Sequence, residues 1–388
     1  MSNISPGDRT RVVILHAYSP RNSGDGLLVE LARSIVAEAF GEADVVVIAS
    51  DAEAFASDEV IQWTSPISLG GSELGRRLSM LLTGLTGPSR ETRDAVAKAD
   101  VIIAVGGGYL RGGHFAESVK SWGAHYGQVK LAARHGDRSV YLPQSIGPFR
   151  GLYLSMMRRQ LGSVSAVFVR DDRSVRELAG VAGVRRAPDM AVLELGGAFA
   201  EPGELVAAAR PIVIARDLNR PRHYYELLDQ MAASGEYDWA VQSRGGGNND
   251  TPLTTRLAGF DAPDLRDVLA ENAPRVVIST RLHGALSSLI AGYPTIHLSY
   301  ERKGWGAFED LGLEDYVLSA RDATLPEIEA LRARIEGDPA SYWSAIRDRS
   351  GHIADGHASI IDSLRSALAS GRGPTASTGV ASAGSSHL

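Results

Sequence analysis

Short apolar runs rich in β-branched residues alternate with segments of helical periodicity along the 388-residue chain. Such continuous apolar runs are typical of parallel strands buried on both faces, with helices as the crossover connections. The alternation therefore predicts an α/β fold and gives no sign of a sandwich or a helical bundle. The segments expected to be strands are 12–15, 45–49, 101–105, 139–142, 164–169, 211–215, 237–241, 275–279 and 294–298. The expected helices include 27–40, 91–98 and 173–178.

The strand pattern lapses between Leu193 and Arg210, and a new strand is expected to begin at Pro211. At about 150 residues per domain, the chain length indicates two or three domains. On each side of the break an apolar run opens into a turn, at Gly106 in the first part and at Thr280 in the second. We therefore expect two Rossmann-like domains, residues 1–195 and residues 205–370.

The carboxyl-terminal part of the chain is expected to end in a helix and a tail. A helical stretch over about 339–370 is expected to pack back on the first domain. Residues 371–388 are rich in Gly, Ser and Ala, and this composition predicts a disordered tail.

Composition excludes several classes of function. The chain has no cysteine, which excludes disulfides, thiolate zinc sites and a cysteine nucleophile. The 40 basic and 46 acidic residues give a net charge of −6, which argues against a nucleic-acid partner. No apolar run approaches the ~18 residues that span a bilayer, and run 12–15 is too short for a signal peptide. We expect a cytoplasmic protein with at most peripheral contact at the inner face of the membrane.

Ligands of open α/β sheets bind beyond the carboxyl ends of the strands, so the residues that follow each run are the candidates for binding. In the first domain these candidates are Asn22, Asp25, Gly106, Gly107, Gly108, Gln144 and Ser145. Taken alone, Asp25 predicts a helix N-cap. The glycines fit a tight turn as well as close backbone approach to an anion or a sugar. The polar loop with Gln144 and Ser145 fits a turn and a substrate contact equally.

Two further segments of the first domain are assigned structural roles. Arg170, Asp171 and Ser174 predict a capped helix start with its own ion pairs. Asp189 predicts a carboxylate buried in a turn. The triple glycine does not match a dinucleotide-binding fingerprint, because Arg111 stands where that motif needs its third glycine.

In the second domain, Arg216 follows run 211–215, and Arg281 and His283 fall on the first turn after run 275–279. A helix start favours an anion by about 0.3–1 kcal/mol. A charge-assisted hydrogen bond contributes about 1.5–3 kcal/mol, so the arginines would dominate phosphate or carboxylate binding. Positive potential at a helix start lowers the pKa of an imidazole, which predicts that His283 is neutral and able to accept a proton.

Lys303 follows the run at 294–298 and is expected beside Arg281. Two neighbouring positive charges are costly unless an anion shares the site, so Lys303 is expected to contact such an anion. Trp305 and Phe308 follow in the same segment, and for Phe308 we expect a role in covering the core. No metal site is predicted, since the nearest pair of ligand types, His114 and Glu117, fits hydrogen bonding better.

The spaced motifs together resemble those of the polysaccharide pyruvyltransferase family, over about Val12 to Tyr316. The set from Ser279 to Leu313 is the most specific. In chain order the matching pieces are Asn22…Gly24-Asp25, Gly106-Gly107-Gly108, Gln144-Ser145-Ile146-Gly147-Pro148, Arg170-Asp171…Ser174, Pro188-Asp189, Arg216, Asp250, Ser279-Thr280-Arg281-Leu282-His283-Gly284, Gly292-Tyr293-Pro294 and Tyr300…Lys303…Phe308…Leu311-Gly312-Leu313. The glycine-rich stretch Gly245–Gly247 before Asp250 departs from the family pattern.

The resemblance implies two Rossmann-like domains in a glycosyltransferase-B-like arrangement, with the active site between them. It implies phosphoenolpyruvate as the donor substrate, with no cofactor. The acceptor would be a sugar of a cell-surface polysaccharide, a glycolipid or a lipid-linked precursor, and two of its hydroxyls would form a ketal with the pyruvyl group. On this basis Arg216 and Arg281 hold the donor, Lys303 contacts it or a carrier phosphate, Asp250 is a substrate contact, and His283 is the acid and base. An oligomer is compatible with the sequence.

Two other functions remain open at this point. In a glycosyltransferase of the same architecture, Arg281 and His283 would bind the diphosphate of a nucleotide sugar. In a non-catalytic sugar-binding relative, one of these two residues would be expected to be lost. Both are present, which counts against the second alternative.

Overall fold

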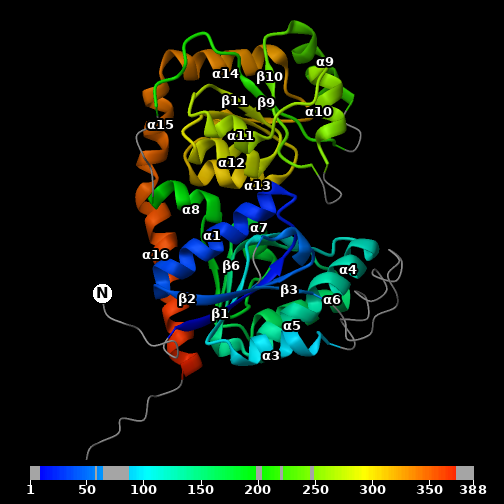
Figure 1. Ribbon diagram of the computed structural model, residues 1–388, viewed down its shortest axis with the longest axis vertical. Coiled ribbons are helices and arrows are strands. Elements are labelled where there is room, and N and C mark those ends of the chain that lie inside the picture. The colour runs from blue at the N-terminus through cyan, green and yellow to red at the C-terminus, as the bar shows by residue number, and fades with distance from the viewer. Residues whose placement is uncertain are drawn as a thin grey trace, which may run out of the picture.

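The computed structural model describes residues 9–56, 59–63, 87–197, 203–218, 222–244 and 249–372. Figure 1 shows two α/β halves stacked along the long axis of the molecule, with the first half below and the second half above. The predicted tail 371–388 is wrong for residues 371 and 372, which belong to the last helix, Ser350–Arg372. The rest of the tail and the stretch Gly245–Gly247 lie outside the described residues.

The first half is built on a parallel sheet that has eight strands in the described part of the chain. The order β3-β2-β1-β4-β6-β7-β8, with β5 also paired to β6, is the doubly wound order expected of a Rossmann-like domain. Its strands are β1 (Thr10–Ala17), β2 (Ala43–Ala49), β3 (Val60–Gln62), β4 (Val101–Ala104), β5 (Gly107–Leu110), β6 (Ser139–Ile146), β7 (Ala166–Val169) and β8 (Val184–Arg186).

The second half has a parallel sheet of five strands within the described residues, in the order β10-β9-β11-β12-β13. Its strands are β9 (Ile212–Ile214), β10 (Asp238–Trp239), β11 (Val277–Ser279), β12 (Thr295–Ser299) and β13 (Val317–Ser319). Each apolar run predicted as a strand contributes residues to one of the two sheets. The α/β prediction is therefore confirmed.

Helices cover both sheets and the junction between them (Figure 1). The helices of the first half are α1 (Ser23–Phe40), α3 (Arg90–Lys98), α4 (Phe115–Ser121), α5 (Gly127–Arg134), α6 (Gly151–Leu161), α7 (Asp172–Glu177) and α8 (Met190–Gly197). Those of the second half and the carboxyl terminus are α9 (Arg222–Ser234), α10 (Thr251–Ala258), α11 (Leu265–Ala270), α12 (Leu282–Ile290), α13 (Arg302–Asp310), α14 (Leu325–Gly337), α15 (Pro339–Asp348) and α16 (Ser350–Arg372). No helix among the described residues is long and apolar enough to cross a membrane.

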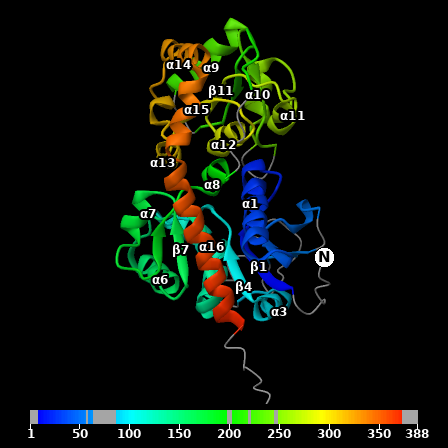
Figure 2. The same ribbon diagram turned by 90° about the vertical axis from the view of Figure 1, so that its left-hand side faces the viewer.

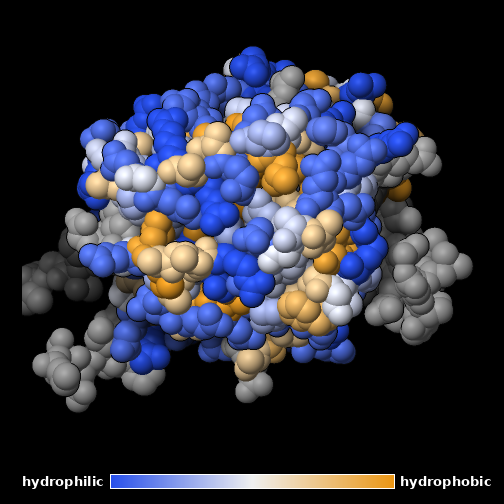
Figure 3. All heavy atoms as spheres, turned by 90° about the horizontal axis from the view of Figure 1, so that it is seen from above, coloured by the Kyte–Doolittle hydropathy of each residue, from blue (hydrophilic) through white to orange (hydrophobic). Residues whose placement is uncertain are grey.

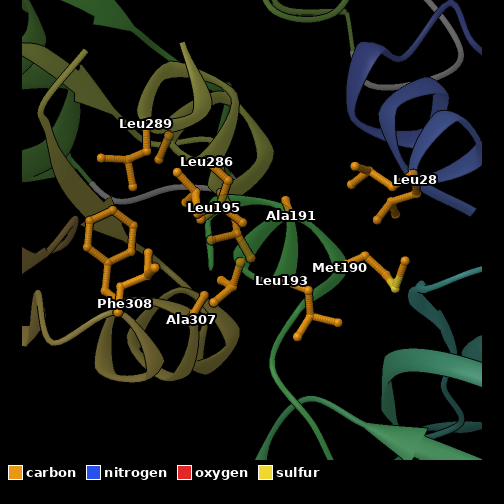
Figure 4. Packing of buried hydrophobic residues seen from close by; sticks show 14 of the residues in the cluster. Leu28, Met190, Ala191, Leu193, Leu195, Leu286, Leu289, Ala307 and Phe308 are labelled. Carbon is orange, nitrogen blue, oxygen red and sulfur yellow. The ribbon is translucent and has the colours of Figure 1, made fainter. Parts of the chain in front are cut away.

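Helix α8 joins the two halves through apolar packing, as Figure 4 shows. Met190 and Leu193 are buried in the same core cluster as Leu28 of α1 and Leu286 of α12. The sequence predicted a connecting segment from Leu193 onward, and this was wrong for residues 193–197. These residues continue a helix because both sides of α8 are covered by apolar side chains.

The carboxyl-terminal helix α16 returns to the first half and runs along it (Figure 2). Ile360 and Leu364 of α16 are buried in the core cluster that also contains residues of β1 and β4. Arg185 of β8 donates a hydrogen bond to Ser363, and Arg372 at the end of the helix lies 3.8 Å from Asp100. The single predicted stretch 339–370 is two helices, α15 and α16, rather than one.

The outer end of the second half is mostly hydrophilic, with hydrophobic residues in small separate groups (Figure 3). Among the described residues of this half, Val206 and Phe260 are exposed singly. Isolated exposed apolar residues are ordinary for a soluble surface. The polar side chains that distinguish this protein lie instead at the junction of the two halves.

Candidate active site

The segment after β1 contacts the second half directly. Asn22 forms an isolated antiparallel bridge with Ser243. A Cβ placed on Gly24 would lie only 2.7 Å from Nδ1 of His283, so the imidazole packs against the backbone of α1. Glycine is needed at this position because any side chain would push the two halves apart. The carboxyl ends of β1 and β11 thus deliver their following residues to one site at the junction.

His283 lies in the first turn of α12, and its Nε2 is buried with no hydrogen-bond partner among the described residues. Burial lowers the pKa of His283 to about 4, against the effect of Asp189, while Arg170, Lys303 and Arg281 lower it further. The imidazole is therefore neutral near pH 7. The sequence attributed this neutrality to the helix start, but burial is the larger cause. A neutral imidazole has one ring nitrogen that can accept a proton.

Arg281 is the N-cap residue of α12, one position before its first turn. Its Nε donates to Oδ2 of Asp250 at 2.9 Å, and its Nη2 donates to Oδ1 of the same carboxylate. Both side chains are buried. The carboxylate fixes the plane of the guanidinium, as bidentate pairs do. Asp250 is therefore placed as the partner of Arg281, at the start of α10.

Arg216 follows β9 and packs its guanidinium over the ring of Tyr300, 4.9 Å from the ring centroid. Its Nη1 also donates a hydrogen bond to the hydroxyl of Tyr300. The hydroxyl of Tyr224 accepts from the backbone N–H of Arg216 at 3.2 Å and so fixes the start of this segment. Cation–π contact and hydrogen bonding together hold the arginine in one orientation.

Lys303 lies in the first turn of α13, and its Nζ is 3.2 Å from the carboxylate of Glu301. Burial lowers the pKa of Lys303, Glu301 raises it, and the charges of Arg170 and Arg216 lower it again. Lys303 thus shares its surroundings with Arg170 and Arg216. Phe308 of the same helix is buried against His297, with ring centroids 5.2 Å apart, which places Phe308 in the core.

The sequence analysis missed Arg170 and Asp189 as residues of this site. Arg170 follows β7 and is buried, with its Nε donating to Ser145 Oγ at 3.0 Å and its Nη1 donating to Asp189. Both charges influence the pKa of His283. Arg170 directly follows an apolar run, as Arg216 does, and that signal could have identified it. The predicted capping role belongs to Asp171, whose Oδ1 accepts from the backbone N–H of Ser174 at 2.8 Å.

Asn22, rather than Asp25, is the N-cap of α1. Its Oδ1 accepts from the backbone N–H of Gly24 at 3.3 Å, and its Nδ2 donates to Oδ2 of Asp25 at 2.8 Å. Asp25 lies in the first turn instead. Asparagine and aspartate are both good caps, and the sequence alone does not decide which residue is the last outside the helix. Asp25 is half-buried at the junction.

Gly106 lies in the short connection between β4 and β5, and both Gly106 and Gly107 allow close backbone packing. A Cβ on Gly106 would meet the carbonyl oxygen of Pro143 at 2.7 Å, and Gly107 has a φ of 147°. Gly107 begins strand β5. A Cβ placed on Gly108 would lie 3.7 Å from Nη2 of Arg170, so Gly108 packs close to that guanidinium. The glycines are needed for this approach of β5 to β6.

Gln144 and Ser145 lie in strand β6 rather than in the loop that the sequence predicted. Strand β6 is longer than its apolar run, because β5 and β7 pair with its polar end. Ser145 reaches Arg170, and Gln144 is fully buried. Among the described residues, no three His, Asp or Glu side chains gather as metal ligands.

The family model described as polysaccharide pyruvyl transferase matches residues 22–302. No curated protein matches the chain. The UDP-GlcNAc 2-epimerase from Neisseria meningitidis bound to UDP-GlcNAc is similar in structure, with a TM-score of 0.52 and 11% identity over 92% of this chain and 99% of that chain. A UDP-glucosyltransferase from Polygonum tinctorium has a TM-score of 0.48 and 12% identity over 94% and 99% of the two chains.

The likeness to the epimerase extends over nearly the whole of both chains and concerns the fold alone. It confirms two Rossmann-like domains in a glycosyltransferase-B-like arrangement. The family model covers well over half of the chain and runs from Asn22 to α13, so it includes Asp25, Arg170, Asp189, Arg281 and His283. On this match, and with those residues gathered at one junction, the chain belongs to the polysaccharide pyruvyl transferase family.

Proposed function

We propose that the chain moves a pyruvyl group from phosphoenolpyruvate to two hydroxyls of a sugar and forms a ketal. The observation that carries this proposal is a cluster of cations beside a neutral histidine. Arg170, Arg281 and Lys303 lie close enough to His283 to lower its pKa, and Arg216 lies close enough to Lys303 to do the same. A small polyanion with both a phosphate and a carboxylate matches this cluster in charge.

The arginines suit this donor because their orientation is already fixed. Asp250 holds Arg281, Tyr300 holds Arg216, and Arg170 is held by Asp189 and Ser145. Guanidinium groups fixed in this way lose little conformational freedom when they bind a carboxylate or a phosphate. Lysine contributes a point charge without directional preference, which suits the role of Lys303 as an additional contact to the donor or to a phosphate of the acceptor carrier.

His283 is the group proposed to remove the proton from the attacking sugar hydroxyl. The oxygen of that hydroxyl bonds to C2 of the enol, C3 gains a proton, and a second hydroxyl then displaces phosphate. The low pKa of the free imidazole rises when a polyanion neutralises the nearby cations, so donor binding makes His283 a stronger base. Holding two hydroxyls against one carbon is chiefly a matter of orientation.

The acceptor is proposed to be a sugar of a cell-surface polysaccharide, a glycolipid or a lipid-linked precursor. This class follows from the family to which the chain belongs. The reaction as written needs no cofactor, and it would take place in the cytoplasm, where phosphoenolpyruvate is available. Lipid-linked acceptors would require peripheral contact with the inner face of the membrane.

The test is an assay of phosphate release from phosphoenolpyruvate with glucose, galactose, mannose and N-acetylmannosamine derivatives, in the presence of a chelator. We expect release with at least one acceptor, together with a product whose mass shows an added pyruvyl ketal. Melting temperature is measured in parallel with phosphoenolpyruvate or with nucleotide sugars. Stabilisation by a nucleotide sugar but not by phosphoenolpyruvate would favour a glycosyltransferase and overturn the proposal.

The proposed role of His283 is tested by His283→Ala. General base catalysis contributes about 10²–10⁴ in rate, so kcat should fall by that factor while donor affinity changes little. His352→Ala, an exposed histidine of α16, is the control and should keep full activity. Normal turnover of the His283 variant would mean that another residue is the general base.

A further inference from the structure

Asp25 and His283 are carried by adjoining segments of the two halves. The backbone of Gly24 contacts the imidazole of His283, and Asn22, which bridges to Ser243 of the second half, holds the Asp25 carboxyl by a hydrogen bond of 2.8 Å. This bond uses Oδ2 of Asp25. The remaining oxygen, Oδ1, has no hydrogen-bond partner within the described ranges and is the atom on which a proton would sit.

Asp25 differs from Asp189, Asp250 and Glu301 in the kind of side chain that its carboxylate contacts. Asp189, Asp250 and Glu301 each lie within ion-pair distance of an arginine or a lysine. In the part of the chain that the structure describes, Asp25 has a neutral amide as its hydrogen-bond partner and no cation within 4.0 Å. A guanidinium or ammonium partner favours the ionised form of a carboxylate more strongly than a neutral amide does.

The surroundings of Asp25 and His283 shift the pKa values of the two side chains in opposite directions. Burial raises the pKa of Asp25 to about 6, against the effects of Asn22, Lys303 and Arg281, while burial lowers the pKa of His283 to about 4. Lys303 and Arg281 are the charged groups that act on Asp25 from the second half. A bound polyanion would offset both, so donor binding favours the protonated form of Asp25. Neighbouring groups shifted in this way are a common arrangement for an acid and a base.

We propose that Asp25 is the acid that protonates C3 of the donor and the base that completes the ketal. This inference rests on the proposed function. In the first step, His283 takes the proton of the first hydroxyl as its oxygen bonds to C2, and the Asp25 carboxyl gives its proton to C3. In the second step, the oxygen of the second hydroxyl bonds to C2 as the C2–O bond to phosphate breaks, Asp25 takes the proton of that hydroxyl, and the phosphate takes the proton from His283. Both side chains are then restored.

The first experiment compares Asp25→Asn with wild type, using phosphate release for kcat and calorimetry for the affinity of phosphoenolpyruvate. Loss of the transferable proton should lower kcat by about 10²–10⁴, the range of acid–base catalysis. Donor affinity should be unchanged or higher, because a negative charge next to a polyanion is removed. The control is Asp100→Asn, another half-buried aspartate, whose carboxylate accepts from the backbone N–H of Arg11 at 2.8 Å near the amino-terminal ends of β1 and β4. It should keep the activity of wild type.

A second measurement separates proton transfer from a structural role. The kcat of wild type should fall on the alkaline side as Asp25 loses its proton, Asp25→Glu should keep that pH dependence at reduced rate, and the residual activity of Asp25→Asn should lack it. Activity of Asp25→Asn within about threefold of wild type, an unchanged alkaline limb, or parallel losses of kcat, donor affinity and melting temperature would overturn the inference while leaving the proposed function intact. Failure of wild type to release phosphate would overturn both.

Discussion

Each half of the molecule contributes one buried arginine–aspartate pair to the junction, and the two pairs differ in geometry. Arg281 directs both Nε and Nη2 to Asp250, whereas Arg170 divides its bonds between Asp189 and the neutral hydroxyl of Ser145. Asp250 therefore fixes the plane of the Arg281 guanidinium by itself, whereas the guanidinium of Arg170 is held by a carboxylate and a hydroxyl together. We expect the second half to supply a rigid anchor and the first half to supply the stronger contact to the donor.

The largest expected effect comes from removing a carboxylate from either pair. Asp250→Asn and Asp189→Asn each leave a buried guanidinium without its counter-charge, which costs about 3–5 kcal/mol of unfolding free energy. We expect Asp250→Asn to lose more unfolding free energy than Asp189→Asn, because Asp250 accepts hydrogen bonds from both Nε and Nη2 of Arg281. Urea unfolding measures this difference.

The control for that experiment is Asp229→Asn in the surface pair with Arg256, whose side chains are 55% and 52% exposed. Exposed pairs contribute about 0–1 kcal/mol, so this variant should unfold nearly as wild type does. Equal stability of all three variants would show that the buried pairs do not hold the junction together.

The second prediction concerns donor binding and distinguishes the two arginines. Lysine cannot reproduce the fork of a guanidinium, so Arg170→Lys should weaken binding of phosphoenolpyruvate by about tenfold or more, from loss of a charge-assisted hydrogen bond. Arg281→Lys should cost less affinity, since two of the Arg281 nitrogens already donate to Asp250. Calorimetric titration measures both, with the surface variant Arg210→Lys as control. A larger loss of donor affinity for Arg281→Lys than for Arg170→Lys would mean that the second half supplies the stronger contact to the donor.

The third prediction concerns pH, because both pairs act on His283. Its pKa is lowered from 6.5 to about 4 by burial and by the arginines, so between these values the unfolded chain binds a proton that the folded chain excludes. The contribution of His283 to unfolding free energy is therefore complete above about pH 6.5 and is lost as the pH falls toward 4. His283→Gln should flatten this dependence by up to about 1.4 kcal/mol per pH unit.

The comparison must be made with wild type because other groups titrate in the same range. The lowered pKa of His297 also makes the unfolding free energy decrease as the pH falls. The raised pKa of Asp25 has the opposite effect, because the folded chain then binds the proton more tightly. Identical slopes for His283→Gln and wild type would mean that the imidazole is not buried in solution.

The smallest expected effect on stability comes from the third ion pair of the site, Lys303 with Glu301, whose side chains are 25% and 32% exposed. Lys303→Met keeps the aliphatic stem and removes the charge. The melting temperature without ligand should hardly change, while the Michaelis constant for the donor or the acceptor should rise several-fold. A large loss of stability with unaltered kinetics would make Lys303 structural.

Sequence reasoning located the sheets well and the site in part. Apolar runs such as 101–105 became strands because local burial on both faces determines them. The glycine-rich strand β5 and the polar end of β6 carry no apolar signal, and pairing with neighbouring strands makes them part of the sheet. Arg216, Arg281 and His283 lie where residues after strands are expected. Asp189 was not assigned to the site, because its pairing with Arg170 depends on how the chain folds between them.

The return of α16 to the first half also has a consequence for biosynthesis. The first half is synthesised long before residues 350–372, yet Ile360 and Leu364 of this helix complete its core. A nascent chain of only the first 200 residues therefore exposes the apolar surface of the first half that Ile360 and Leu364 cover in the complete fold. We therefore expect the first half to gain its full resistance to proteases and to aggregation only after residues 350–372 have been made.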